Sequence, residues 1–283
     1  MREHSKEHTV VRLCEVLEVS SSGYYDWLDR PESKTSRENR HLLERIRTAH
    51  GRSNQVYGAP KIHKDLVAEG ETCSKPRVAR IMRKAGIQSK LRRKFVVTTD
   101  SKSTTQPAPD LLKREFTAQS PDRAWVSDTS FISTREGWLY LAIMLDLYSR
   151  QVIGWSMAEK NNTELVEDAL QMALKRRGKV TDVIVHSDQG NTYASSRYRS
   201  LLEEQGLRCS MSRKGECLDN SVAESFFGSL KNELVHHEDY RTRSEARRSI
   251  FEYIEVFYNR RRRHATLDYF TPVEIEERYA PNF

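Results

Sequence analysis

The sequence predicts an α/β protein of the α+β type, in which an all-α amino-terminal region precedes a core of mixed strands and helices. Three observations lead to this fold class. Apolar residues recur at helical spacing in the first hundred residues, residues 98–110 are polar without periodicity, and β-branched and aromatic runs typical of strands begin at residue 124. The 283 residues suit roughly two domains, at about 150 residues per domain.

The first 50 residues form a helical segment with a candidate helix-turn-helix. Residues 10–17 have apolar side chains at helical spacing, the run Val19-Ser-Ser-Ser-Gly23 interrupts them, and an apolar and aromatic stretch resumes over residues 24–28. A helix, a Ser/Gly turn and a second short helix make either a DNA-binding helix-turn-helix or an ordinary helical hairpin. Both interpretations stay open on this segment alone.

A second and clearer helix-turn-helix is predicted over residues 51–97. A helix is expected over residues 61–69, Gly70 ends it, and Pro76 suits the first turn of a further helix that runs to Lys84. One face of this last helix is apolar and another is cationic, as a DNA-recognition helix requires. The apolar face holds Val78, Ile81, Met82 and Ala85, and the cationic face holds Arg77, Arg80 and Lys84.

The formal net charge of +7 is concentrated in this domain. Residues 51–100 hold twelve basic and four acidic side chains, whereas the rest of the chain is close to neutral. Residues 75–94 hold nine basic side chains and no acidic one. A solvated helix face would carry acids too, so the stripe predicts nucleic-acid binding. The DNA contacts expected in it are Arg77, Arg80, Arg83, Lys84, Arg92, Arg93 and Lys94.

A linker over residues 98–115 leads to a catalytic core predicted over residues 116–235, and residues 236–283 follow as a carboxy-terminal helix and basic tail. Three closely spaced strands at the start of the core indicate an antiparallel meander. The core elements follow the order β-β-β-α-β-α-β-α. They are strands over residues 124–132, 139–147, 151–157, 183–185 and 207–211, and helices over residues 163–177, 195–205 and 220–234, with the final helix over 244–258.

Three acidic residues lie where packing alone would not place them. Asp128 interrupts an apolar strand, Asp188 follows a buried strand, and Glu224 lies early in an apolar and aromatic helix. One such acid is commonly a turn former or a cap, but three together indicate a shared site. Mg²⁺ or Mn²⁺ prefers carboxylate oxygens, and two such ions about 3.5–4 Å apart serve phosphodiester displacement. We therefore expect these acids to hold two divalent ions.

Other conspicuous residues have competing interpretations. Asp146 lies in a central strand just before a turn and is expected to support either the core or the strand end. Trp125, Trp138 and Trp155 are expected in the core rather than in stacking on bases. The basic run Arg260, Arg261, Arg262 and Arg263 is either a DNA-backbone contact or a solvated helix end, and the neighbouring Tyr258 and His264 favour DNA.

Composition and motifs exclude several protein classes. No stretch approaches the roughly 18 to 20 apolar residues of a membrane span, and residues 1–8 are too polar for a signal peptide. The four cysteines form no Cys-x-x-Cys pair, which argues against a zinc site. A tyrosine recombinase needs His-x-x-Arg, and none of the nine histidines has arginine three residues later. We expect a cytoplasmic protein without a membrane partner.

Motifs along nearly the whole chain carry a family resemblance. They are Tyr57-Gly, Trp125-Val-Ser-Asp-Thr, Asp146-Leu-Tyr-Ser-Arg-Gln-Val-Ile-Gly-Trp155, His186-Ser-Asp-Gln-Gly190, Asp219-Asn-Ser-Val-Ala-Glu-Ser-Phe-Phe-Gly-Ser-Leu-Lys-Asn-Glu233 and Tyr258-Asn-Arg-Arg-Arg-Arg-His264. The core resembles the retroviral-integrase, ribonuclease H-like core with its Asp-Asp-Glu triad, and 35 residues separate Asp188 from Glu224 as in integrase-type members. More narrowly, the chain resembles the larger-reading-frame transposase of bacterial insertion sequences that use two overlapping frames.

This resemblance implies a function and roles for named residues. It implies that Asp128, Asp188 and Glu224 carry the divalent ions and that Lys231, about two helical turns after Glu224, holds a DNA phosphate. It implies recognition of terminal inverted repeats, cleavage that frees a 3′-hydroxyl, and transfer of that hydroxyl to target DNA. A homo-oligomer on double-stranded DNA, an upstream-frame partner protein and nucleoid association in a bacterial cell are further implications.

Two other functions share parts of this pattern. A sequence-specific regulator with an inactive core would keep the helix-turn-helix units, although the presence of all three acids argues against it. A nuclease of the ribonuclease H type would share the core, but it would not explain the helix-turn-helix units.

Overall fold

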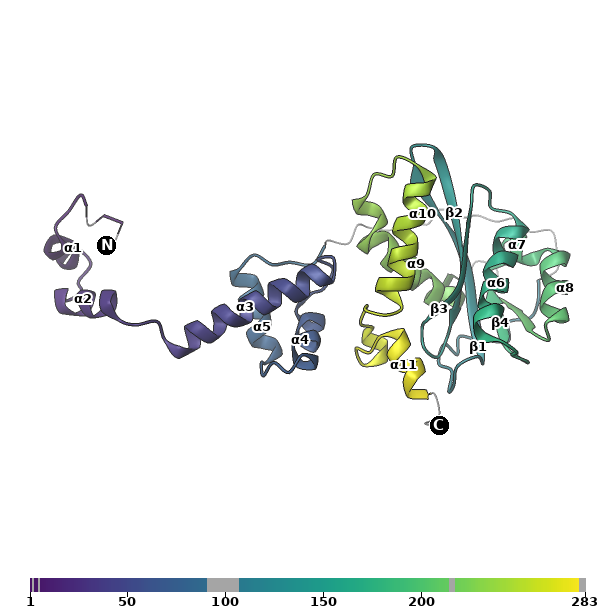
Figure 1. The fold of residues 1–283 in the computed structure, drawn as a ribbon, viewed down its shortest axis with the longest axis horizontal. Helices are drawn as coiled ribbons and strands as arrows, with labels where there is room; N and C mark the ends of the chain where they lie inside the picture. Colours follow the sequence, from purple (N-terminus) through teal and green to yellow (C-terminus); the bar gives the residue numbers. More distant parts are fainter. Residues whose placement is uncertain (2, 5, 91–106, 214–216, 280–283) are drawn as a thin grey trace.

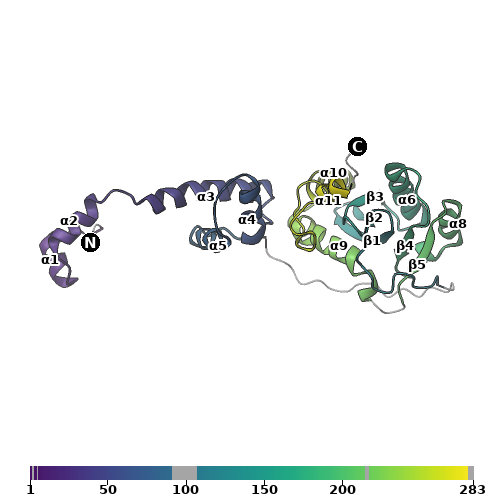
Figure 2. The same cartoon turned by 90° about the horizontal axis from the view of Figure 1, so that it is seen from below.

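The structure is a computed structural model that describes residues 1–279 except residues 2, 5, 91–106 and 214–216. Helices occupy the amino-terminal third, and a twisted sheet between two layers of helices forms the rest (Figures 1 and 2). This arrangement confirms the predicted α/β class with an all-α region ahead of the core. None of the helices in the described ranges has the length and apolar composition that crossing a bilayer requires.

Two short helices open the chain. They are α1 (Val10–Val16) and α2 (Ser21–Asp29), which agree with the expected apolar stretches. Each helix begins after a hydroxyl residue that caps it. The side chain of Thr9 accepts the backbone N–H of Arg12, and the side chain of Ser20 accepts the backbone N–H of Gly23. The Ser-rich run between the two stretches therefore acts as the cap of α2.

The basic helical domain has three helices, one more than expected. They are α3 (Lys34–Arg52), α4 (Ala59–Ala68) and α5 (Lys75–Lys84). Leu42 and Ile46 of α3 are buried in the same hydrophobic cluster as Ile62, Leu66 and Val78. The boundary expected at residue 50 therefore cuts through a packed unit, because α3 is a structural part of this domain and not of the preceding segment.

The core sheet has five strands in the order β3-β2-β1-β4-β5. The strands β1 (Ala124–Thr134), β2 (Gly137–Asp146) and β3 (Val152–Ala158) form the predicted antiparallel meander. The strands β4 (Ile184–Ser187) and β5 (Arg208–Met211) add to the other side of β1 in parallel. This order makes β1 the central strand, with β4 beside it.

Helices cover both faces of the sheet (Figure 2). One face packs on α6 (Thr163–Arg177), on the short α7 (Asn191–Ala194), which was not expected, and on α8 (Ser196–Glu204). Gly154 of β3 permits the close approach of α6, since an added Cβ would lie 2.2 Å from the carbonyl oxygen of Ala169. The other face packs on α9 (Ser221–Glu233) and on the carboxy-terminal helices.

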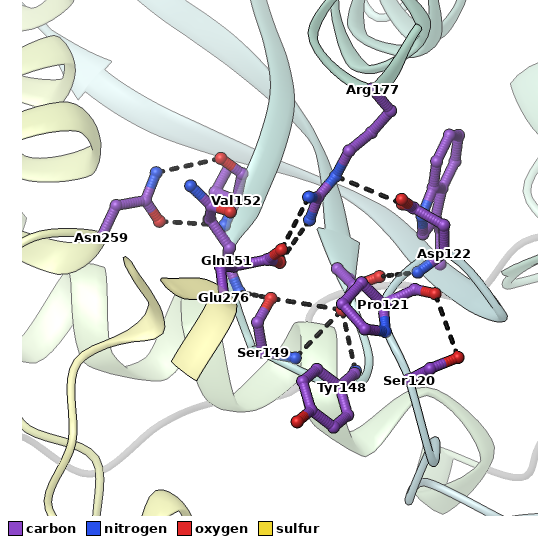
Figure 3. Close-up of polar contacts among 12 residues, drawn as sticks. Ser120, Pro121, Asp122, Tyr148, Ser149, Gln151, Val152, Arg177, Asn259 and Glu276 are labelled. Atoms are coloured by element: carbon purple, nitrogen blue, oxygen red, sulfur yellow. Dashed lines mark hydrogen bonds and ion pairs between the residues drawn. The ribbon is translucent and has the colours of Figure 1, made fainter. Parts of the chain in front are cut away.

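The carboxy-terminal segment is part of the core. Helix α10 (Arg243–Phe251) continues as the π-helical turn η3 (Glu252–Tyr258), and Ile250 and Ile254 join the hydrophobic cluster that contains β1 and α9. A last helix, α11 (Pro272–Tyr279), was not expected and is held by ion pairing between Glu276 and Arg177 of α6 (Figure 3). Packing therefore continues across residue 235, where the core was expected to end.

Candidate active site

Strand register places two of the three predicted acids side by side. Asp128 lies in β1, and Asp188 directly follows β4. The parallel register pairs Val126 with His186. Asp128 comes two residues after Val126, and Asp188 comes two residues after His186, so the same register brings the two acids level with each other. Neighbouring strands lie about 4.8 Å apart, and residues two apart share a face. The sheet itself therefore holds the two carboxylates next to each other.

The orientation of Asp188 depends on the glycine that follows it. The backbone N–H of Gly190 donates to Oδ1 of Asp188 at 2.9 Å. A Cβ at residue 190 would lie 2.9 Å from the same oxygen, so a larger residue would displace the carboxylate. The Asp-Gln-Gly sequence thus forms a tight turn that fixes Asp188 at the end of β4.

The third acid comes from α9. Ala223 and Phe226 are buried in the cluster that also contains Val126 and Ile132 of β1, so α9 lies against the central strand. Glu224 precedes one of these buried positions by two residues and is itself exposed. The element order and the packing therefore bring all three acids to one region.

The pKa of Asp128 depends on the other two acids. The pKa of Asp128 is well above its ordinary value, chiefly because burial disfavours the charged form, and then because the charges of Asp188 and Glu224 oppose a further negative charge. Desolvation also raises the pKa of the half-buried Asp188 and, through the part of its carboxyl that the protein covers, that of the more exposed Glu224. A cation placed among these carboxylates would relieve the repulsion.

The donor chemistry fits a hard divalent cation. Mg²⁺ is usually held by one or two carboxylates together with phosphate and water oxygens, and Asp128 and Asp188 are two carboxylates on adjacent strands. Within the described ranges, no three His, Cys, Asp or Glu side chains converge as a ready-made metal cluster. Glu224 therefore interacts with Asp128 through its charge without completing such a cluster.

Lys231 lies near the acids, as its position two turns after Glu224 predicted. Its ammonium group lies 5.2 Å from the ring centre of Phe131 and lowers the pKa of Asp128 by its charge. Burial lowers the pKa of Lys231, an effect that the charge of Asp128 opposes. The lysine is therefore a cation at the edge of the acidic site.

The two polar residues directly before α9 have partners that the sequence did not indicate. Asp219 is 1% exposed and pairs with Arg114 and Arg213, which hold its pKa well below the ordinary value. The next residue, Asn220, donates to the carbonyl of Ser127 at 3.3 Å and ties the start of α9 to β1. The motif was visible in the sequence, but the partner residues are far from it along the chain.

Asp146 is a structural acid, as expected. Its Oδ1 accepts the N–H groups of Tyr148 and Ser149 at 2.9 and 3.0 Å, and its Oδ2 accepts the N–H of Asp122 at 2.9 Å. The donor residues Asp122, Tyr148 and Ser149 are labelled in Figure 3. These contacts close the turn between β2 and β3 and confirm that Asp146 supports the strand end.

The three tryptophans differ in burial. Trp125 is fully buried, which confirms a core role, and Trp155 is half-buried with its indole N–H donating to Glu255 at 2.7 Å. Trp138 is 49% exposed, so its expected core position is wrong. It follows Gly137 at the hairpin between β1 and β2 and stacks edge-on against Phe131.

Helix α5 presents most of its predicted cations to solvent. Arg80, Arg83 and Lys84 are exposed, while Val78, Ile81 and Met82 are buried on the opposite side. Arg77 is half-buried and pairs with Glu38 of α3 at 3.2 Å, so it is engaged within the domain. The remaining residues expected to contact DNA in this domain, Arg92, Arg93 and Lys94, lie outside the described residues.

The basic run before His264 is divided between solvent and the interior. Arg260 and Arg261 are exposed, in keeping with a surface role. Arg262 is 11% exposed and pairs with Glu233, and Arg263 is 15% exposed and pairs with Asp65. Carboxylates of the same chain bind these two guanidinium groups. In this structure Arg262 and Arg263 are therefore not available for the expected contacts with the DNA backbone.

Comparisons with known proteins agree with this geometry. Residues 118–217 and 224–279 match integrase core domain families, and residues 36–95 match an HTH-like domain family. The chain is 40% identical over 280 residues to the transposase InsF for insertion sequence IS3A of Escherichia coli (strain K12), covering 98% of this chain and 97% of that protein. It is 39% identical to the insertion element IS600 uncharacterized 31 kDa protein of Shigella sonnei, covering 94% and 98%.

Solved structures with similarity to this chain include the HTLV-2 integrase catalytic core domain in complex with magnesium, with 15% identity, a TM-score of 0.42, and coverage of 56% of this chain and 98% of that chain. Identity of 40% over almost the full length of both chains, together with the integrase core and HTH-like matches, settles the family. The chain belongs to the insertion-sequence transposases that have an integrase core.

Proposed function

We propose that this protein is a DNA transposase that binds the terminal inverted repeats of an insertion sequence and catalyses Mg²⁺-dependent phosphodiester cleavage and 3′-hydroxyl strand transfer. The observation that carries the proposal is the placement of Asp128, Asp188 and Glu224. Two of these acids are fixed by the register of β1 and β4. The pKa of Asp128 is raised by burial and by the charges of Asp188 and Glu224, and desolvation raises the pKa of the other two acids. Membership in the transposase family supports the same reaction.

The carboxylates would hold two divalent ions, Mg²⁺ or Mn²⁺, which when bound supply positive charge for the attacking and leaving oxygens. Asp128 and Asp188 are rigid donors because strand pairing and the turn at Gly190 fix their backbones. Glu224 extends from α9, whose start is tied to β1 through Asn220. Lys231 would bind a phosphate beside the reacting one, where its charge also moderates the acidic site.

The reaction has two displacements at phosphorus. In the first, the oxygen of water bonds to phosphorus and water gives up a proton, while the bond from phosphorus to the 3′-oxygen breaks and the freed 3′-oxygen takes up a proton to become a 3′-hydroxyl. In the second, the oxygen of this hydroxyl bonds to a phosphorus of the target DNA and loses its proton. The bond from that phosphorus to the target's own 3′-oxygen breaks, and this oxygen leaves from the opposite side and takes up a proton. No bond to the protein forms in either step.

The cations on α5 would read the inverted repeats. Arg80, Arg83 and Lys84 are exposed on one face of α5, as a helix entering the major groove requires. Arg260 and Arg261 provide further exposed charge. Assembly as a homo-oligomer on paired ends, interaction with an upstream-frame protein and association with the bacterial nucleoid when DNA-bound are parts of the same proposal.

A cleavage and joining assay tests the proposal. Labelled element ends are incubated with the full chain and Mg²⁺, with and without the upstream-frame protein, beside Asp128→Asn and the control Asp182→Asn. Asp182 is exposed and precedes β4, whereas Asp188 follows the opposite end of that strand, so the Asp182 variant should cut and join as the wild type does. Equal activity of wild type and Asp128→Asn contradicts the catalytic assignment.

The same assay separates the alternative functions. Binding to the element ends with no cleavage under any of these conditions would favour a regulator with an inactive core. Preferential cleavage of an RNA–DNA hybrid would favour a nuclease of the ribonuclease H type.

A further inference from the structure

Residues 259–263 contact three separate parts of the molecule, and we call them the junction segment. Asn259 forms two hydrogen bonds with the backbone of Val152, accepting its N–H at 2.9 Å and donating to its carbonyl at 3.0 Å (Figure 3). This pairing fixes the start of the segment to β3 at the edge of the sheet. The segment therefore has a defined position relative to the strands.

Arg262 connects the junction segment to the helix that carries Glu224. Its guanidinium donates to both carboxylate oxygens of Glu233, at 2.8 and 2.7 Å, and to the hydroxyl of Ser229 at 3.0 Å. Ser229 and Glu233 belong to the second half of α9, and the hydroxyl of Tyr253 donates to the same carboxylate. Bidentate pairing of a buried arginine fixes both distance and direction.

The neighbouring residue connects the segment to the basic helical domain. The guanidinium of Arg263 pairs with Asp65 of α4 and also donates to the carbonyl of Tyr269 at 2.9 Å. Tyr57, which is 2% exposed, donates its hydroxyl to the carbonyl of Arg261 at 2.8 Å and accepts the N–H of Arg263 at 2.7 Å. One buried hydroxyl and one ion pair therefore attach this domain to the segment.

We propose that Arg262 and Arg263 are positioning residues that set the orientation of the DNA-binding helices relative to the catalytic helix α9. The proposal rests on the proposed function and deepens it. Arg262 binds α9 and the next residue, Arg263, binds α4. Because the two residues are consecutive, the helical domain cannot rotate relative to α9 without breaking one of these contacts. The junction segment then determines which phosphate of a bound element end reaches Asp128.

The expected effect concerns the place of cleavage rather than DNA affinity. The ion pair joins Asp65 of α4 to Arg263, whose side chains are 21% and 15% exposed, and it includes none of the exposed cations of α5. Loss of the pair should leave binding of element ends within about threefold, since neither side chain is assigned to DNA. A misplacement of about 1 Å costs on the order of 100-fold in rate, so cleavage at the element boundary should fall by that order.

The test is a charge exchange between the two residues. Asp65→Arg and Arg263→Asp should each reduce cleavage at the element boundary, while the double variant should recover most of the loss, because it restores the pair in reverse. Asp182→Arg is the matched control for Asp65→Arg, since it makes the same charge change at an exposed residue. Cleavage of each labelled end is mapped to the nucleotide, and end binding is measured in parallel.

A second variant gives a readout independent of activity. Tyr57→Phe removes only the hydroxyl that accepts the N–H of Arg263, so hydrogen exchange at that amide should accelerate at least about tenfold while exchange in the sheet stays unchanged. Unchanged exchange at Arg263 would overturn the contact itself in solution.

The outcomes separate the two proposals. A wild-type protein that does not cleave element ends contradicts the proposed function. A wild type that cleaves, with single variants that cleave equally well at the same nucleotide, overturns the junction alone. Single variants that lose end binding, or a double variant that recovers nothing, also overturn it, because the side chains would then act on DNA or on folding and not on orientation.

Discussion

Asp128 and Asp146 are acids on neighbouring strands, and they differ in what surrounds them. Burial raises the pKa of both. Asp146 accepts backbone N–H groups from Asp122, Tyr148 and Ser149, which compensate its charge with fixed dipoles. Asp128 accepts the N–H of Thr129 and faces two other carboxylates. Asp146 is fully buried with its hydrogen bonds supplied and is structural, whereas Asp128 is half-buried among like charges and would be stabilised by a cation.

The largest expected effect comes from neutralising Asp128. Asp128→Asn should lower the rate of cleavage by on the order of 1,000-fold or more, because metal charge stabilisation is worth several kcal/mol and each 1.36 kcal/mol is tenfold in rate. The variant should stay folded, since it removes a repelled charge. Single-turnover cleavage and urea unfolding measure the two quantities. A variant that is inactive because it is unfolded would not support the contrast.

Asp146 should show the reverse behaviour. Asp146→Ala leaves three backbone N–H groups without their acceptor in the interior, and each lost hydrogen bond to a charged group costs about 1.5–3 kcal/mol, partly offset by water. We expect a loss of about 3 kcal/mol in the free energy of unfolding. The folded fraction should cleave DNA at a normal rate. Full stability with lost cleavage would instead place Asp146 in the active site.

The pH dependence of stability sharpens the contrast further. Because the pKa of Asp128 is raised, the folded protein holds this proton more tightly than the unfolded chain does. The contribution of this proton to the free energy of unfolding is therefore fully present below the ordinary pKa of about 3.8, and it is lost as pH rises through the raised pKa of Asp128. Thermal unfolding across this range should show a smaller loss in Asp128→Asn than in the wild type.

Added Mg²⁺ should counter that loss at neutral pH. At 100 times its Kd, a ligand of the folded state adds about 2.7 kcal/mol to the free energy of unfolding. The gain should be present in the wild type and in the control Asp182→Asn, and much smaller in Asp128→Asn. An equal gain in all three proteins would place the bound ion elsewhere.

The smallest effect is expected from Gly190→Ala. The added Cβ would lie 2.9 Å from Oδ1 of Asp188, so the carboxylate must rotate. Because Asp188 lies at the end of a fixed strand, we expect about a tenfold loss of cleavage, a change of about 1.4 kcal/mol, with stability nearly unchanged. Gly51→Ala is the control, since a Cβ there meets no atom within 4 Å. Equal activity of the two variants would show that Asp188 tolerates rotation.

Much of the fold and the acidic site could be predicted because the signals are local. Strand runs, turn residues and the helical spacing around Glu224 are short-range patterns, and the structure has β1, β4 and α9 close to their expected positions. The short α7 and the terminal α11 are missing from the prediction because a helix of one or two turns has little periodicity to detect. The long α3 was visible only as scattered apolar residues among many charges.

The roles of single cations could not be predicted in the same way. Arg80 and Arg263 are alike in sequence, but Arg80 is exposed and Arg263 is bound by Asp65, 198 residues away. Arg262 is bound by Glu233, 29 residues away. Whether an arginine faces solvent or a carboxylate depends on which elements pack beside it, and no short-range pattern contains that information.

The parallel pairing of β1 with β4 has a consequence for how the chain can vary. The distance between Asp128 and Asp188 is determined by three register pairs and not by the number of residues between them. Residues can therefore be added at the exposed turn around Gly178, after α6, without separating the acids. One residue inserted between Ile184 and Asp188 would turn the acid to the opposite face of the sheet. Insertions in related sequences should accordingly be found at the turn and be absent from β4.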